Sequence, residues 1–142
     1  MHDHSKLLTV SIAAYNVGGT LGRTLASLEC SEKLMQMLDI IIVNDGSTDR
    51  TADIADDFRA SHPGSVRVFN KANGGYGSTV NLSLSNAEGL YFKLLDGDDA
   101  FDTENLEEFI KYLDSLCVNE LCIPDLVITP FYYEQTGKTI RV

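Results

Sequence analysis

The sequence has no apolar run that approaches the roughly 20 residues needed to cross a bilayer. Its first residues, MHDHSKLLTV, also lack the long apolar core of a secretory signal peptide. We therefore expect a cytoplasmic protein. Peripheral attachment to the inner face of the membrane, through a part beyond residue 142, stays open as an alternative.

Positive charge is scarce in this chain. Lys and Arg number 11 against 21 Asp and Glu, which gives a formal net charge of −10. This balance argues against nucleic-acid binding by a basic surface, because such binding depends on Lys and Arg that neutralise phosphates. An anionic ligand would need local help, either from backbone N–H groups or from a bound cation.

Cysteines are few and form no metal-binding pattern. Cys30, Cys117 and Cys122 are odd in number and match no zinc spacing, so we expect free thiols in a reducing compartment. The chain also has no internal repeat, low-complexity segment or linker. With 142 residues, 44% of them apolar, it is long enough for one domain and too short for two. Residues 1–142 are therefore expected to form a single domain.

What the sequence does have is a regular alternation of two hydrophobic patterns. Short β-rich runs alternate, about every 25–30 residues, with longer segments of helical spacing. Strands are expected at 7–13, 40–43, 66–69, 91–95 and 126–129, helices at 21–28, 51–60, 78–87 and 103–116, and a β-hairpin at 131–134 and 139–142. Asp49 and Thr103 are expected to cap helices, and Gly89 to close one. This order predicts an α/β fold with a mainly parallel, Rossmann-like sheet flanked by helices.

Four polar clusters follow the first four expected strands. They occupy residues 14–16, 44–49, 73–77 and 96–99. In parallel sheets, ligands bind at the carboxyl ends of the strands, where the strand order reverses. Because all four clusters fall at that edge, we expect them to form one site.

Two of these clusters also have plainer interpretations. Residues 47–49 can be a turn with a helix cap, and the NGGYG stretch can be a flexible turn before a helix. NGGYG does not complete the GxGxxG pattern, because Val80 occupies the last glycine position. The Gly137-Lys138-Thr139 triplet has Tyr132 where a P-loop needs glycine. These departures disfavour a P-loop ATPase and a dinucleotide-binding domain.

The DGDD cluster has no comparably plain interpretation. Four carboxylates directly follow an apolar strand, and like charges so close together repel; they belong to Asp96, Asp98, Asp99 and Asp102. A calcium loop is disfavoured because Ala100 and Phe101 replace its fifth ligand and its required glycine. Asp96 and Asp98 can both reach one hard cation, Mn²⁺ or Mg²⁺, that in turn carries a diphosphate.

Four motifs together resemble family 2 glycosyltransferases, which have the GT-A fold. VSIAAYN, IIVNDGSTDRT, NGGYGSTVN and YFKLLDGDD occur in the family's order and spacing, and the similarity covers about residues 7–130. The resemblance implies transfer of a sugar, with inversion, from a nucleotide diphosphate-sugar to a glycan or lipid-linked acceptor. A UDP-sugar is the expected sugar donor, and a divalent metal, Mn²⁺ or Mg²⁺, the expected cofactor.

The resemblance also implies roles for single residues. Ala13 and Tyr15 lie where the family's first strand meets the nucleobase, with the Tyr15 ring available to stack on it. Asp45 matches a carboxylate that accepts a hydrogen bond from uracil or ribose. Asp96 and Asp98 match the motif that binds the metal and the ribose-diphosphate. Asp99, beside them, is expected to contact these metal ligands and not the metal itself.

One position departs from the related loop NGGVSAARN. An arginine precedes the final asparagine there, whereas Val80 takes that position here. No side-chain contact to the diphosphate is therefore expected from residue 80. Lys71 and Lys93 are alternative sources of positive charge, although an exposed lysine and a sheet lysine are the plainer interpretations.

The general base of the family lies well downstream, and residues 134–142 offer no candidate. The base is therefore expected beyond Val142, and the chain is interpreted as the nucleotide-sugar-binding part of a longer enzyme of polysaccharide, glycolipid or glycoprotein synthesis. A non-catalytic nucleotide-sugar-binding module stays open. A metal-dependent phosphohydrolase is less favoured, because it needs an aspartate after the first strand, where this chain has Ala13-Ala14-Tyr15. A homodimer through the edge at 136–142 also stays open.

Overall fold

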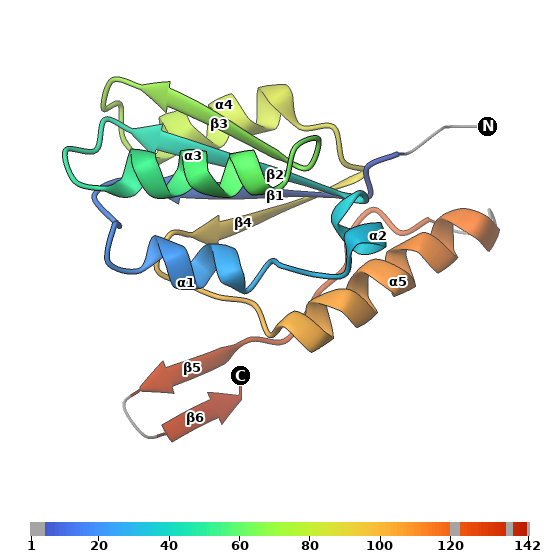
Figure 1. Ribbon diagram of the computed structural model, residues 1–142. Helices are drawn as coiled ribbons and strands as arrows, with labels where there is room; N and C mark the ends of the chain where they lie inside the picture. Colours follow the sequence, from blue (N-terminus) through green and yellow to red (C-terminus); the bar gives the residue numbers. More distant parts are fainter. Residues whose placement is uncertain (1–4, 120–122, 136–137, 142) are drawn as a thin grey trace.

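A four-stranded parallel sheet forms the centre of the molecule (Figure 1). The computed structural model describes residues 5–119, 123–135 and 138–141. The strand order is β3-β2-β1-β4 and every neighbouring pair is parallel. The strands are β1 (Leu8–Ala14), β2 (Leu38–Asp45), β3 (Val66–Lys71) and β4 (Tyr91–Asp96). The predicted α/β class with a parallel sheet is confirmed.

Helices cover both faces of this sheet. α4 lies on one face, and α1 and α3 lie on the other (Figure 1). The helices are α1 (Leu21–Ala26), α2 (Glu32–Met35), α3 (Thr51–Ser61), α4 (Tyr76–Asn86) and α5 (Thr103–Asn119). The short α2 was not expected, because four residues are too few to show a helical period.

The core follows from the hydrophobic pattern. β2 is buried along its whole length, as a continuous β-branched run predicts for a strand covered on both faces. Leu106, Ile110 and Leu113 of α5 belong to the same buried cluster as the strands. Their spacing of three to four residues places them on one side of the helix.

The order of the strands creates a switch point beside β1. The chain moves from β1 to β2 to β3 in one direction and then returns to place β4 on the other side of β1. Ala13 of β1 pairs with Asp96 of β4. On its other side, Ala14 pairs with Asn44 of β2. The carboxyl ends of β2, β1 and β4 therefore meet where ligands of such sheets bind.

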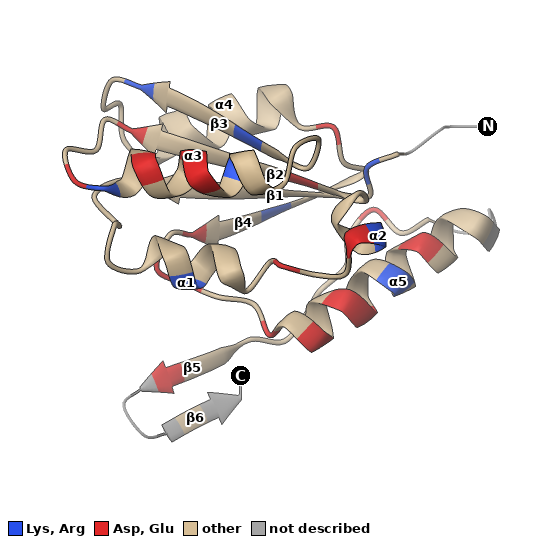
Figure 2. Ribbon diagram, viewed as in Figure 1, with Lys and Arg blue, Asp and Glu red and all other residues tan. Residues whose placement is uncertain are grey.

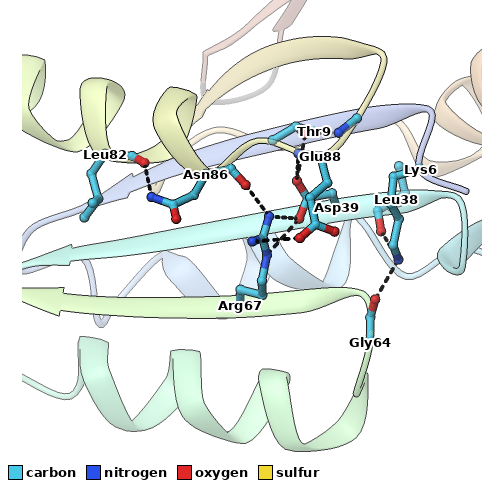
Figure 3. Close-up of polar contacts among 10 residues, drawn as sticks. Lys6, Thr9, Leu38, Asp39, Gly64, Arg67, Leu82, Asn86 and Glu88 are labelled. Atoms are coloured by element: carbon cyan, nitrogen blue, oxygen red, sulfur yellow. Dashed lines mark hydrogen bonds and ion pairs between the residues drawn. The ribbon is translucent and has the colours of Figure 1, made fainter. Parts of the chain in front are cut away.

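A polar network holds the opposite, amino edge of the sheet (Figure 3). The buried Asp39 carboxylate accepts hydrogen bonds from the Arg67 guanidinium at 2.7 and 3.1 Å and from the Thr9 hydroxyl at 2.8 Å. It also accepts one from the Glu88 N–H at 3.0 Å. Arg67 in turn donates to the Asn86 carbonyl at 2.7 Å. This network fastens the connection between α4 and β4 to the sheet, far from the switch point.

The expected fifth strand at 126–129 is wrong. These residues form no strand, and Leu126 and Ile128 are 74% and 85% exposed. A β-rich sequence forms a strand only where a neighbouring strand supplies hydrogen bonds, and no described strand lies beside it. The expected hairpin is confirmed as an antiparallel pair of β5 (Tyr132–Gln135) and β6 (Lys138–Arg141), although residues 136, 137 and 142 lie outside the described ranges.

The predictions about helix ends need correction. α4 ends at Asn86, and Gly89 is required because an added Cβ would lie 2.3 Å from the Thr9 backbone nitrogen. At α5, Asp102 supplies the capping contact by accepting from the Asn105 N–H at 3.1 Å, whereas the Thr103 hydroxyl donates to the Ser27 carbonyl. At α3, Arg50 takes the cap position without a side-chain bond, and the Asp49 carboxylate accepts from the Thr51 N–H at 2.9 Å.

Two further expectations concern the whole chain. Within the described ranges, no helix has both the length and the apolar character that crossing a membrane requires. Cys30 and Cys117 are free thiols, as expected, while Cys122 lies outside the described residues.

Candidate functional site

Charged side chains gather at the carboxyl ends of the strands. Acidic residues end β2 and β4, and a basic residue ends β3 (Figure 2). They are Asp45, Asp96 and Lys71. Since parallel strands all point the same way, these ends lie on one edge of the sheet, as the sequence pattern predicts.

The DGSTD segment joins two loops of this edge. The Ser47 hydroxyl accepts from the Asn16 N–H at 3.0 Å, and the Asn16 side chain accepts from the Thr48 N–H at 2.9 Å. The Asp49 carboxylate accepts from the Gly18 N–H at 2.9 Å. These bonds favour the plainer interpretation of residues 47–49, in which they fix the loop after β1 against the loop after β2.

Asp45 is the organising carboxylate of the next loop. It is 3% exposed, and its Oδ1 accepts from the Gly74 N–H and its Oδ2 from the Gly75 N–H, both at 2.9 Å. Gly75 has φ of 84°, a left-handed conformation that glycine adopts without strain. The hydrogen bond from Lys71 is the main cause that holds the pKa of Asp45 below its usual range, against the opposing effect of burial. Asp45 is therefore ionised and shapes the Asn73–Gly75 loop.

Lys71 is not the free surface cation that the plainer interpretation expects. Its ammonium group pairs with Asp45 and also donates to the Ser78 hydroxyl at 2.8 Å and to the Ala72 carbonyl at 2.9 Å. Three contacts use the three N–H bonds of a lysine ammonium. Lys93 lies in the middle of β4, opposite Val10, and so away from this edge. Neither lysine presents unused positive charge to a ligand there.

The DGDD turn gathers three carboxylates at the end of β4. One oxygen from each of Asp96, Asp98 and Asp99 can be chosen so that all lie within 4.8 Å of one another, and all three residues are exposed. Loss of hydration raises the pKa of Asp99, and the negative charges of Asp98 and Asp96 raise it further. The repulsion that the sequence predicts is thus present in the structure.

Two threonines hold this turn, Thr20 at the N-cap of α1 and Thr24 within the helix. The Thr24 hydroxyl, 1% exposed, lies 3.0 Å from the Gly97 carbonyl and 2.6 Å from the Asp99 carbonyl. The Thr20 hydroxyl donates to the Gly97 carbonyl at 2.9 Å. Gly97 itself is confined, because an added Cβ would lie 2.9 Å from the Val17 side chain. Sequence reasoning missed both threonines, since a threonine in or beside a helix gives no signal of which carbonyl its hydroxyl contacts.

Tyr76, the first residue of α4, was also missed. Its side chain is 52% exposed and lies near enough to Asp96 to feel the charge of that carboxylate. Partial burial raises the pKa of Tyr76, and the negative charge of Asp96 raises it further. The sequence offered only a tyrosine inside the NGGYG stretch. Such a tyrosine is compatible with a site residue and equally with an ordinary loop residue.

The two residues predicted to face a nucleobase lie on β1. Ala13 is partly buried and pairs with Asp96, so it lies directly beside the acidic turn. Tyr15 follows the end of β1 and is 53% exposed. All of the predicted site residues thus lie at one edge, with Asp45 on one side of β1 and the acidic turn on the other.

The acidic turn fits a divalent cation. Its carboxylates supply hard oxygen ligands, and they stand close enough together for one ion to contact more than one of them. A cation would also relieve the repulsion that raises the pKa of Asp99.

A parallel sheet of this order, with an acidic turn at its switch point, defines a GT-A-type domain. The family model "Glycosyl transferase family 2" matches residues 9–137, and the chain belongs to this family. The resemblance inferred from the four motifs is thereby confirmed.

Relatives and solved structures agree with this assignment. The chain is 36% identical over 136 residues to the "Uncharacterized glycosyltransferase EpsJ" of Bacillus subtilis, covering 96% of this chain and 37% of the relative. It is 34% identical over 116 residues to a chondroitin synthase of Pasteurella multocida, covering 79% of this chain and 12% of the relative. The crystal structure of S. aureus TarS in complex with UDP-GlcNAc matches with a TM-score of 0.68 and 25% identity, over 84% of this chain and 37% of that chain. The chain thus spans well under half the length of these proteins.

Proposed function

We propose that the chain is the nucleotide-sugar-binding portion of an inverting, metal-dependent glycosyltransferase. The observation that carries this proposal is the position of Asp45 and of the acidic turn on the two sides of β1, at the switch point of a GT-A sheet. One side would hold the nucleoside and the other the diphosphate. The acceptor is proposed to be a glycan or a lipid-linked glycan.

The nucleoside would lie against the ends of β1 and β2. The Tyr15 ring is exposed and can stack on a base. Asp45 Oδ1 already accepts from Lys71 and Gly74, whereas Oδ2 accepts from Gly75 alone. Oδ2 therefore keeps one acceptor position for an N–H of the base or an O–H of the ribose. UDP-GlcNAc in the TarS crystal structure supports a UDP-sugar as the sugar donor.

The diphosphate would lie at the acidic turn. Asp96 and Asp98 are the proposed ligands of Mn²⁺ or Mg²⁺, with Asp99 supporting them. Such an ion, when bound, stabilises the negative charge of a departing nucleoside diphosphate. Thr20 and Thr24 fix the backbone of the turn, and Ala13 pairs with Asp96 across the sheet. The general base that deprotonates the acceptor is proposed to lie outside residues 1–142.

Calorimetric titration of the 142-residue chain with UDP, GDP and dTDP, each with Mn²⁺ or with EDTA, tests the proposal. We expect UDP to bind roughly tenfold or more tightly with Mn²⁺, because the ion removes repulsion between carboxylates and phosphates. Asp98→Asn should reduce this gain, whereas Asp114→Asn, the same change on α5, should leave it intact. Equal UDP affinity in EDTA would contradict the metal site, and no nucleotide binding under any condition would contradict the proposed function.

A further inference from the structure

One lysine side chain joins three elements of the candidate site. The Lys71 ammonium, at the end of β3, pairs with the Asp45 carboxylate at the end of β2. It also donates to the Ser78 hydroxyl, in the first turn of α4, at 2.8 Å. That hydroxyl in turn donates to the Gly75 carbonyl at 2.7 Å. The ammonium therefore ties two strand ends and the start of α4 together at one point.

The same contacts fix the orientation of the Asp45 carboxylate. Its Oδ1 accepts from Lys71 and from the Gly74 N–H, and its Oδ2 accepts from the Gly75 N–H. Donors on both oxygens hold the plane of the carboxylate. With two donors on Oδ1 and one on Oδ2, the open acceptor position belongs to Oδ2.

Burial makes the cation necessary at this position. The side chain of Asp45 is 5% exposed and that of Lys71 is 23% exposed, and a buried carboxylate is costly without a compensating charge. Within the described part of the chain, Lys71 is the only charged side chain that contacts Asp45, and the other contacts come from backbone N–H groups. Its hydrogen bond is also the main cause of the lowered pKa of Asp45.

We propose that Lys71 is a positioning residue that holds the Asp45 carboxylate for the nucleoside, occupying Oδ1 and leaving Oδ2 to the ligand. This inference rests on the proposed function and assigns Lys71 a role other than direct contact with the diphosphate. All three N–H bonds of its ammonium are used within the protein. Lys71 therefore acts on the nucleotide through Asp45, and its effect should disappear when the Asp45 carboxylate is removed.

A double-mutant cycle tests this dependence. UDP affinity is measured by calorimetry with Mn²⁺ for the wild-type 142-residue chain, Lys71→Met, Asp45→Asn and the double variant. We expect Lys71→Met to weaken UDP binding by about three- to tenfold in the wild-type background, the effect of one hydrogen bond acting indirectly. It should cause no further loss in the Asp45→Asn background. Unchanged UDP affinity in Lys71→Met, or an equal loss in both backgrounds, would overturn the positioning role.

Two further variants make the cycle decisive. Lys111→Met is the matched control, because Lys111 pairs with Glu108 at 2.9 Å on α5 and the variant has the same net charge as Lys71→Met. It should bind UDP like wild type, and a loss equal to that in Lys71→Met would reduce the effect to net charge and overturn the inference. Lys71→Gln repeats the cycle if Lys71→Met does not fold, because Gln keeps a hydrogen-bond donor and lacks the charge. It should show the same coupling to Asp45 with a smaller loss of affinity.

A readout without any ligand separates this role from packing of the loop. Carbon-13 NMR of the Asp45 carboxyl group follows its titration in the free protein. In Lys71→Met the midpoint should rise above that of wild type, because the main cause of the lowered pKa is gone while burial remains. Lys111→Met should leave the midpoint unchanged. An unchanged midpoint in Lys71→Met would show that the lysine only packs the loop, and would overturn the inference.

The same measurements separate this inference from the proposed function. If wild type binds no UDP under any condition, the proposed function fails and the inference fails with it. If wild type binds UDP more tightly with Mn²⁺ and the cycle shows no coupling between Lys71 and Asp45, only the inference fails.

Discussion

The Asp45 carboxylate and the Gly75 N–H meet at 2.9 Å, so the residue expected to contact the nucleotide also builds the loop beside it. Gly74 and Lys71 contact the other oxygen of the same carboxylate. Binding and local folding therefore depend on one side chain. A substitution of Asp45 should affect both.

Asp45→Asn should lower the free energy of unfolding by about 1–3 kcal/mol, because the amide cannot accept all of these hydrogen bonds and leaves Lys71 without its counter-ion. UDP affinity should fall by roughly tenfold or more, because the acceptor on Oδ2 and the shape of the loop are both altered. Urea unfolding and calorimetry measure the two effects. Asp57→Asn removes an exposed charge on α3 without touching the loops of the site and should keep UDP affinity. Unchanged UDP binding in Asp45→Asn would show that Asp45 serves the loop alone.

The stability of the chain should depend on Asp45 at acidic pH. The Lys71 hydrogen bond holds the folded-state pKa of Asp45 below its usual value of 3.8, which an unfolded chain would show. The stabilisation is therefore fully present above that value and is lost as the pH falls through the folded-state pKa. Urea unfolding from about pH 6 downward should show the gap between wild type and Asp45→Asn narrowing below about pH 4. A gap that stays constant over this range would contradict an ionised, paired Asp45.

Gly97→Ala should disrupt the acidic turn. The added methyl would lie 2.9 Å from the Val17 side chain and 3.2 Å from the Ala13 carbonyl, so the turn must move. We expect a loss of about 1–3 kcal/mol of stability, as for other overpacked sites, together with weaker Mn²⁺ binding. Gly22→Ala is the control, because it has open space at a helical position of α1 and should be neutral or stabilising. Unchanged Mn²⁺ affinity in Gly97→Ala would show that the position of the turn does not govern the metal site.

Arg67→Met should reduce stability without affecting the nucleotide site. It leaves the carboxylate of Asp39, which is 2% exposed, without its cation, and breaking such a pair costs about 3–5 kcal/mol in buried settings. Arg67 is partly exposed, so the lower end of this range is expected. Arg59→Met removes an exposed ion pair with Asp56 and should cost under about 1 kcal/mol. Because this network lies at the amino edge, the UDP affinity of folded Arg67→Met should match wild type, and a large loss would contradict the separation of the two edges.

Much of the fold could be predicted because its signals are local. A continuous run such as Ile40–Val43 predicts a buried strand without knowledge of its neighbours. The strand expected at 126–129 failed because pairing depends on a partner that local sequence does not reveal. Gly89 shows the same limit, since its close approach to Thr9 is a tertiary contact.

The candidate site was predictable in its acidic residues and not in what holds them. Asp45 and Asp96 end apolar strands, and Asp98 follows two residues later, where polar residues are conspicuous. Thr24 acts through contacts with residues far away in the sequence, and a threonine is unremarkable in a helix. Lys71 was expected to be a surface lysine, and only its three contacts show that it belongs to the loop.

The strand order also fixes a distance across the candidate site. Asp96 and Val43 both pair with Ala13, so two strand spacings, about 9–10 Å, separate β4 from β2, and Asp45 lies two residues further along β2. Backbone hydrogen bonding sets that length, and no side-chain substitution can lengthen or shorten it. Ligands in which the same length of chain joins the two ends can therefore bind at this edge, whichever base or sugar each carries.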